Sequence, residues 1–125
     1  MRTRARVSRP SKYHAKPCVV DGIRFASQKE AKRYGELKLL EKAGAIHLLT
    51  LQPEFELWSG AGKGYVQTPI GTYRADFSYC ECPGGAGNCG WSLVTVEDVK
   101  GFKTPLYRWK KKHVEAQYGI AICEI

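Results

Sequence analysis

The sequence has no long apolar run and no cysteine framework, and each absence excludes a class of protein. No stretch of its 125 residues approaches the roughly 20 consecutive apolar residues of a membrane-spanning helix. The basic N-terminus also lacks the apolar segment of a secretion signal. Five cysteines is an odd number, and their scatter is not typical of a secreted, disulfide-bonded domain. We therefore expect a cytoplasmic protein with no membrane partner and with mostly reduced thiols.

Three of the cysteines, Cys80, Cys82 and Cys89, lie close together in the segment CECPGGAGNC. A structural zinc ion needs four nitrogen or sulfur ligands with suitable spacing. The C-x-C start and the missing fourth ligand favour an ordinary hairpin tip, although Cys18, Cys123 or a histidine could complete a zinc site through space. Both interpretations stay open at the level of the sequence.

Acidic residues are absent from the first sixteen positions, although the whole chain holds 12. The basic residues of this segment are Arg2, Arg4, Arg6, Arg9, Lys12 and Lys16. A second basic block consists of Lys103, Arg108, Lys110, Lys111 and Lys112. Because the formal net charge of +8 gathers in an arm and a patch, a polyanion such as DNA is the expected partner. The alternative is a solubilising tail and a solvated helix face.

The length of the chain suits one domain with a real hydrophobic core. We expect residues 1–16 to form a flexible basic arm, because they are poor in large apolar side chains. Residues 17–125 then form a single domain.

The first half of that domain carries clear local signals. CVVDGIRFAS (18–27) predicts two short strands that turn at Asp21 and Gly22. SQKEAKRYGELKLLEKAG (27–44) predicts a helix, because it combines an N-cap residue, helical apolar spacing and a glycine just past the end. AIHLLTLQPEFEL (45–57) then has extended character.

The second half alternates strands with turns and ends with a helix and a strand. SGAGKGYVQTPIG (59–71) is typical of a loop, and TYRADFSYCE (72–81) has the period-2 pattern of one strand. WSLVTVEDVKG (91–101) predicts a central strand covered on both faces. A second helix over 105–119 and a last strand over 120–125 follow. This order predicts an α/β or α+β fold with a central mixed β-sheet flanked by helices.

Two acids and a lysine stand out in the predicted strands. Side chains two residues apart share one face of a strand, so Asp98 and Lys100 emerge together while Glu97 faces the other way. If strands 72–81 and 91–101 pair as a hairpin, Asp76 and Asp98 come close. Two adjacent carboxylates repel unless a proton or a cation lies between them, and Mg²⁺ is the usual solution. The alternative is a surface ion pair between Asp98 and Lys100, with Asp76 paired to its neighbour Arg74.

The order Asp76, then Asp98-Val99-Lys100, after a helix that carries Glu30, resembles the signature of the PD-(D/E)xK nuclease superfamily. The segments DGIRFASQKEAKRYGELKLLEKAG, LQPEFEL, YRADFSY, VEDVKGF and YRWKKKHVEAQYGI further resemble a phage and prophage family placed in that superfamily. The proline that precedes the first acid in the superfamily is replaced by Ala75. The resemblance covers about residues 12–125. It implies a restriction-endonuclease-like core and a metal-dependent DNA endonuclease in the cytoplasm of a phage's host.

The resemblance also implies a role for each residue. Asp76 and Asp98 would bind Mg²⁺ or Mn²⁺ with the backbone carbonyl of Val99, and Glu30 would serve a second ion. Lys100 would orient or deprotonate the attacking water and stabilise charge on the phosphate. Small basic members of the superfamily act on branched DNA as dimers, so a resolvase-like homodimer is one form of this function. The alternative function is a non-catalytic nucleic-acid-binding module with a nuclease-like fold.

Four acids or amides near this signature have rival roles. Ser27-x-x-Glu30 is a capping box, in which the glutamate bonds back to the start of the helix. Glu36, one and a half turns later, is the substitute for Glu30 as the helix carboxylate. Glu97 is expected to be a surface or supporting residue. Gln117 either reaches the site or lies on the helix surface, and the second reading is favoured.

Some side chains of the second helix are expected to face the core, and others to face DNA or water. Tyr107 and Trp109 are expected to face the core. Lys110, Lys111 and Lys112 are consecutive, so they fan round the helix and cannot all be buried. Some of them should meet phosphates or water, and phosphate contacts would make DNA binding weaken steeply as salt rises.

Overall fold

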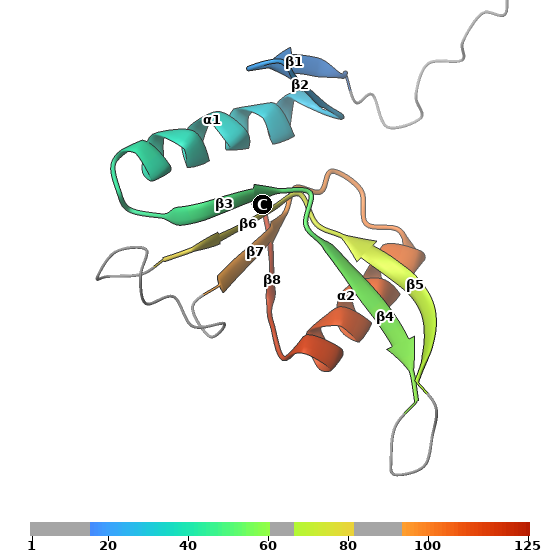
Figure 1. Cartoon of the computed structure of the whole chain (residues 1–125). Helices are drawn as coiled ribbons and strands as arrows, with labels where there is room; N and C mark the ends of the chain where they lie inside the picture. Colours follow the sequence, from blue (N-terminus) through green and yellow to red (C-terminus); the bar gives the residue numbers. More distant parts are fainter. Residues whose placement is uncertain (1–15, 61–66, 82–93) are drawn as a thin grey trace, which may run out of the picture.

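The structure, a computed structural model, describes residues 16–60, 67–81 and 94–125. Its elements are β1 (Cys18–Val20), β2 (Ile23–Phe25), α1 (Gln28–Lys42), β3 (His47–Leu51), β4 (Glu54–Ser59), β5 (Thr68–Arg74), β6 (Phe77–Cys80), β7 (Val94–Asp98), α2 (Pro105–Tyr118) and β8 (Ile122–Glu124). Figure 1 shows the two helices on opposite sides of a central sheet. In the described part of the chain, neither helix is long and apolar enough to cross a membrane.

The central sheet has four strands in the order β3-β6-β7-β8. β7 runs antiparallel to β6 and parallel to β8, so the sheet is mixed, as predicted. The last three residues of β7 are all buried. The predicted central strand with both faces covered is therefore confirmed, and it ends in the middle of the molecule.

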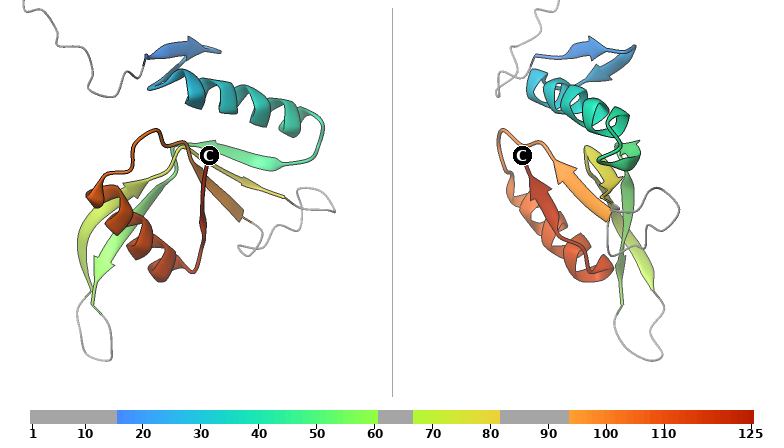
Figure 2. Two further views of the ribbon diagram at one scale, coloured as in Figure 1. Left: turned by 180° about the vertical axis from the view of Figure 1, so that it is seen from behind. Right: turned by 90° about the vertical axis from the view of Figure 1, so that its left-hand side faces the viewer.

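Each face of the sheet has its own apolar core, and Figure 2 shows the sheet between the two helices. The core under α1 comprises Phe25, Ala31, Tyr34, Leu37, Ile46, Phe77 and Tyr79. The core under α2 comprises Leu57, Tyr73, Ala75, Val96, Val114 and Ile122. Burying one large apolar side chain stabilises the folded state by about 1.5–3 kcal/mol. These two clusters therefore hold the helices onto the sheet.

The local signals of the sequence appear as expected. Asp21 and Gly22 have φ of 52° and 74°, the two positive values that a tight two-residue hairpin turn needs. Ser27 and Thr104 cap the two helices, since each hydroxyl group accepts a hydrogen bond of 3.1 Å from a backbone N–H in the first turn. Gly119 ends α2 in the left-handed conformation, with φ of 66°.

Residues 72–81 form two strands rather than the predicted one, because the chain bends at Ala75 and Asp76 between β5 and β6. The segment that faces it, at Gln52 and Pro53 between β3 and β4, bends at the same level. The N–H of Gln52 donates to the carbonyl of Asp76 at 2.8 Å, and the N–H of Ala75 donates to the carbonyl of Pro53 at 3.1 Å. Pro53 has no N–H for a strand ladder, and Gln52 has a positive φ of 50°. β3 to β6 therefore form one long hairpin, bent at Asp76, whose outer half lies beside α2 (Figure 1).

Two predicted boundaries are wrong. The loop predicted over 59–71 is shorter, because β5 already begins at Thr68. The strand predicted over 91–101 is also shorter at its end, because β7 stops at Asp98 and leaves Lys100 beyond the strand.

Several predictions concern residues outside the described part of the chain. These are the basic arm over residues 1–15, with Arg2, Arg4, Arg6, Arg9 and Lys12, the segments 61–66 and 82–93, and Cys82 and Cys89.

The described cysteines differ in redox state. Cys18 and Cys123 are free thiols, as expected. Cys80 is disulfide-bonded and is therefore an exception to the expectation of mostly reduced thiols. Zinc binds thiolate sulfur, and a disulfide sulfur is not a thiolate. Cys80 therefore has no ligand to offer a zinc ion in this state.

Candidate functional site

Asp98, the last residue of β7, is fully buried at 0 % exposure. Its Oδ2 accepts a very short hydrogen bond from the hydroxyl group of Tyr73. Its Oδ1 lies 2.9 Å from Nζ of Lys100, but the direction of approach does not make a hydrogen bond. Among the described residues, this oxygen therefore has a cation beside it and no hydrogen bond. The ammonium group of Lys100 offsets part of the cost of burying this carboxylate.

Asp76, at the bend of the long hairpin, lies opposite Asp98. The paired register ends at Phe77 and Glu97, and the N–H of Asp76 donates to the carbonyl of Glu97 at 3.1 Å. The carboxyl groups of Asp76 and Asp98 are within hydrogen-bonding reach of each other. Oδ2 of Asp76 also accepts a hydrogen bond of 2.6 Å from the N–H of Val99. Burial, and then the contact with Asp98, raise the pKa of Asp76 well above its usual range. A second negative charge at this buried place is unfavourable unless a cation offsets it.

The structural alternative for these acids is wrong in two respects. Asp98 and Lys100 do form an ion pair, but Asp98 is buried and not at the surface. Asp76 does not pair with Arg74, because Arg74 forms its ion pair with Glu54 on the neighbouring strand.

Lys100 is held in place from two sides. Its Nζ lies 4.7 Å from the centre of the Tyr107 ring, a favourable arrangement of a cation over an aromatic face. The other side of the ammonium group faces Asp98. Because the side chain is 28 % exposed, the ammonium group can still reach a ligand in solvent. The sequence predicted that Lys100 lies beside Asp98. It did not predict the contact with Tyr107, which is a residue of α2.

Glu30, in the first turn of α1, is only 6 % exposed. Its backbone N–H forms half of the capping box with Ser27, and its carboxylate accepts a hydrogen bond from the N–H of Ala26. Burial raises the pKa of Glu30, the charge of Lys100 lowers it, and the charge of Asp98 raises it further. The backbone N–H of Glu30 therefore takes part in the helix cap, and its carboxylate lies within electrostatic range of Asp98 and Lys100 at the end of β7.

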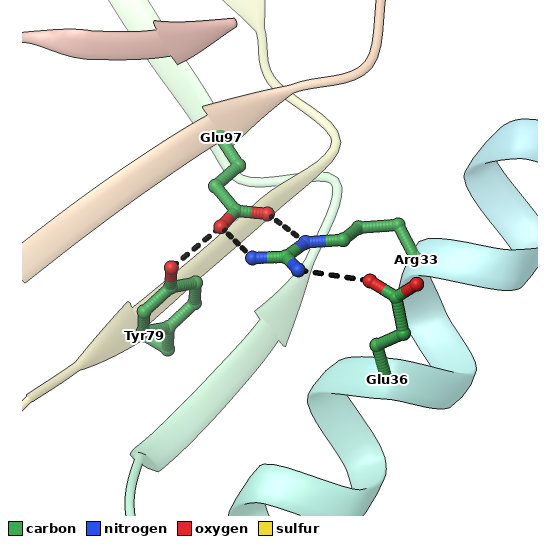
Figure 3. Close-up of polar contacts among 4 residues, drawn as sticks. All are labelled: Arg33, Glu36, Tyr79 and Glu97. Carbon is green, nitrogen blue, oxygen red and sulfur yellow. Dashed lines mark hydrogen bonds and ion pairs between the residues drawn. The ribbon is translucent and has the colours of Figure 1, made fainter. Parts of the chain in front are cut away.

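Glu97 is not a surface residue, because its side chain is 2 % exposed. Figure 3 shows it in a network with Arg33 and Tyr79 on the α1 face of the sheet. Both of its oxygens accept hydrogen bonds from Arg33, and Oε1 also accepts one from the hydroxyl group of Tyr79. Glu36, the substitute for Glu30, pairs with Arg33 and is 47 % exposed. It therefore lies outside the acid and lysine cluster.

We define the carboxylate cluster as Glu30, Asp76, Asp98 and Lys100. Among residues 16–60, 67–81 and 94–125, no group of three or more His, Cys, Asp or Glu side chains is arranged to hold a metal ion. The carboxylates are instead held by donors of the chain itself. The donor set nevertheless fits a hard divalent cation, which prefers carboxylate and carbonyl oxygens. The oxygen of Asp98 that lacks a hydrogen-bond donor is the observation that supports this fit.

The basic patch is partly engaged within the chain. Lys103 and Lys111 both pair with Glu124 of β8, and Nζ of Lys110 donates to the carbonyl of Thr72 at 2.9 Å. The two other members of the patch, Arg108 and Lys112, are exposed. The side chains most open to phosphates are therefore the last two.

Two further expectations on α2 have clear outcomes. Tyr107 packs against the core under α2, as predicted, but Trp109 is 50 % exposed and does not face the core. Gln117 accepts a hydrogen bond from the N–H of Trp58 and donates one to the carbonyl of Glu56. It therefore fastens α2 to β4 and lies outside the carboxylate cluster.

An apolar groove of about 840 Å³ lies elsewhere on the molecule. Its walls include Leu48, Phe55, Val94, Val96 and Ile120. No member of the carboxylate cluster lines it. Glu54 is the one Asp or Glu side chain among the described lining residues of the groove, and it pairs with Arg74, so we place the candidate site at the cluster.

The contacts that sequence reasoning missed are those made by aromatic residues. Tyr73 belongs to the alternating apolar pattern, and nothing in that pattern distinguishes it from a plain core residue. Its hydroxyl group reaches Asp98 only because β5 leaves the central sheet at the bend. Tyr107 reaches Lys100 only because α2 packs back over the end of β7.

The fold and the cluster together define a small α+β protein that gathers three acids and a lysine at the end of its central strand. The chain belongs to the family described as "Protein of unknown function (DUF1064)", whose model matches residues 10–122. No curated protein and no solved structure matches the chain.

Proposed function

We propose that the protein is a metal-dependent DNA endonuclease of the PD-(D/E)xK type that hydrolyses phosphodiester bonds in the cytoplasm of a phage's host. The observation that carries this proposal is the meeting of Asp76, Asp98 and Lys100 at one buried point. These residues come from the bend of the hairpin and from the end of β7. Glu30 approaches from α1. Among the described residues, Oδ1 of Asp98 has the ammonium group of Lys100 beside it and no hydrogen bond, which supports the proposal.

The residues that would hold Mg²⁺ or Mn²⁺ are Asp76, Asp98, the carbonyl of Val99 and Glu30. When bound, such an ion supplies positive charge for the phosphate and makes water more acidic. Lys100 would hold the attacking water or a phosphate oxygen through its N–H groups. Tyr73 keeps the carboxylate of Asp98 in one orientation through its hydrogen bond, because a catalytic group must be held rigidly.

DNA contacts are proposed for the basic residues that remain open. Arg108 and Lys112 on α2 would meet phosphates, together with the basic arm of residues 1–16. Phosphate contacts give affinity without reading sequence, which suits an enzyme selected for DNA shape. Action on branched DNA as a resolvase-like homodimer is the finer form of the proposal.

The test is cleavage of linear, nicked, supercoiled and four-way-junction DNA in Mg²⁺, Mn²⁺ or EDTA. Asp98→Asn and Lys100→Met should each slow cutting by at least about 100-fold, whereas Lys38→Met should cut like the wild type. Lys38 is a fair control because it is a half-exposed lysine on α1 whose ion pair among the described residues is with its neighbour Glu41. Metal-dependent cutting that survives Asp98→Asn and Lys100→Met would contradict the proposal, since another site would then act.

The second candidate is a nucleic-acid-binding module without catalysis. It is favoured by one observation: the described acids are held by donors of the chain and are not arranged as a metal group. Filter binding to the same DNA panel separates the two. Salt-sensitive binding with no cutting in either metal would replace the nuclease by the binding module.

A further inference from the structure

Arg33, on α1, uses every nitrogen of its guanidinium group within the chain (Figure 3). Nε and Nη2 donate to the two oxygens of Glu97 at 2.8 Å and 2.5 Å. Nη1 donates to Glu36 at 2.9 Å. Two parallel hydrogen bonds between guanidinium and carboxylate fix both distance and orientation. This ion pair therefore determines how that turn of α1 lies on β7.

The two ends of the Arg33–Glu97 pair are each next to a member of the carboxylate cluster. Arg33 follows Glu30 by three residues, so the two side chains leave α1 on neighbouring parts of one face. Glu97 directly precedes Asp98 and points to the other face of β7. A single ion pair thus joins the helix that carries Glu30 to the strand that carries Asp98.

Glu30 has no such fastening of its own to the cluster. Among the hydrogen bonds and ion pairs of the described residues, none joins its carboxylate to Asp98 or Lys100, and both act on it through charge alone. Its distance from them is therefore set by the placement of α1. The apolar side chains under α1 fill space, but apolar packing tolerates small shifts of a helix.

Holding a helix against a sheet by a buried ion pair costs desolvation free energy that apolar packing does not. Glu97 is 2 % exposed and Arg33 is 22 % exposed, so both groups lose most of their hydration. Well-packed apolar residues of similar size often stabilise such an interface equally well or better. What the charged pair adds is a defined geometry.

We propose that Arg33 and Glu97 are positioning residues, whose ion pair holds Glu30 at the distance from Asp98 and Lys100 at which it helps to bind the divalent cation. This role rests on the proposed function, because it needs a cation at the carboxylate cluster. Neither residue touches the cation or the substrate. A purely structural pair would instead change stability without changing what Glu30 contributes to metal affinity.

The test is a double-mutant cycle on the affinity for Mn²⁺, measured by isothermal titration calorimetry on the full chain without DNA. The variants are Glu30→Gln, Arg33→Lys and the two together. Lysine keeps the positive charge but cannot make the second parallel hydrogen bond to Glu97. We expect Glu30→Gln and Arg33→Lys each to weaken Mn²⁺ binding by about tenfold, the lower end of the effect of supporting residues. In the Glu30→Gln background, Arg33→Lys should then cost less than about twofold, because it acts through Glu30.

The matched control is Arg74→Lys, which removes a surface arginine that also places two nitrogens on one glutamate, Glu54. It should leave Mn²⁺ affinity unchanged. Glu97→Asp repeats the cycle with the carboxylate shortened by one methylene group, in case Arg33→Lys does not fold. Circular dichroism verifies the fold of every variant.

Two results would overturn the inference and are distinguishable from each other. If Glu30→Gln weakens Mn²⁺ binding but the effect of Arg33→Lys simply adds to it, the pair is structural and the proposed nuclease site stands. If the wild type does not bind Mn²⁺, or if Glu30→Gln has no effect, the cation site proposed at Glu30 falls and the positioning role falls with it.

Discussion

Glu97 and Asp98 follow one another on β7 and are both almost fully buried, at 2 % and 0 % exposure, but they face opposite helices. Both oxygens of Glu97 are satisfied by Arg33 and Tyr79. Asp98 accepts a hydrogen bond from Tyr73, and its other oxygen pairs with Lys100 without a hydrogen bond among the described residues. The carboxyl group of Asp76 is also within reach of Asp98. Equal burial therefore does not mean equal function. We therefore propose that Glu97 supports the structure and that Asp98 serves the chemistry.

The largest expected effect comes from Asp98→Asn. Asparagine keeps the shape of the side chain and an oxygen for Tyr73, but it lacks the charge. The cleavage rate should fall by about 100- to 1,000-fold, as when one electrostatic group of an active site is removed. Thermal stability should stay the same or rise, because the repulsion with Asp76 disappears. Initial rates on plasmid DNA and a thermal melt measure both. An Asp98→Asn protein that cuts normally would contradict the catalytic role proposed for Asp98.

Glu97→Gln should act on stability instead. It leaves the guanidinium group of Arg33 without its buried partner, so the free energy of unfolding should fall by about 2–4 kcal/mol in urea denaturation. This range is set below the full cost for a buried pair because Arg33 is 22 % exposed. Glu36→Gln is the control, since Glu36 binds the same arginine at 47 % exposure and should cost no more than about 0.5 kcal/mol. Equal losses in the two variants would mean that burial of Glu97 carries no special cost.

The paired tyrosines sharpen the comparison further. Tyr79→Phe removes a donor to Glu97 and should cost about 1.5 kcal/mol of stability, with cleavage within about twofold of the wild type. Tyr73→Phe removes the donor that orients Asp98 and should slow cleavage by about tenfold, which equals about 1.4 kcal/mol in the barrier. The same two assays serve both variants. If Tyr79→Phe slowed cleavage more than Tyr73→Phe, the result would indicate that the site of cleavage lies on the face of β7 that carries Glu97.

Glu124, opposite Asp98 on β8, gives the smallest effect. Its ion pairs with Lys103 and Lys111 lower its pKa to about 2, below the value of about 4.3 expected in the unfolded chain. The stability that these pairs contribute is therefore present above about pH 4.3 and is lost as the pH falls toward about 2. Glu124→Gln should be slightly less stable than the wild type at neutral pH. Urea denaturation along a pH series should show the two curves meeting in acid. A difference that persists at the acid end would exclude the ion pairs as its cause.

Short-range signals allowed much of the fold to be predicted. The turn at Asp21 and Gly22 and the caps at Ser27 and Thr104 depend on a few neighbouring residues, so the sequence contains all the physics that they need. The bend at Asp76 was missed for the opposite reason. The apolar alternation runs through it without a break, and only the pairing with the facing chain at Gln52 and Pro53 reveals that the strand changes sheet.

The candidate site, like the fold, could be predicted only where the contacts follow from neighbouring residues in the sequence. Strand periodicity places Asp98 and Lys100 together and Glu97 apart, and the ion pairs agree with this division. Tyr73, Tyr107 and Arg33 could not be assigned, because their contacts depend on the register of β5 and on how each helix lies on the sheet. Such contacts link segments distant in sequence and leave no local pattern.

The most direct test of the proposed nuclease is the position of Mn²⁺ in crystals of the protein, located by its anomalous scattering. We predict one ion bound by the carboxylates of Asp76 and Asp98, and its loss in crystals of Asp98→Asn grown under the same conditions. Crystals saturated with Mn²⁺ that show no ion at these two carboxylates would contradict the proposal, and the carboxylate cluster would then be part of the fold alone.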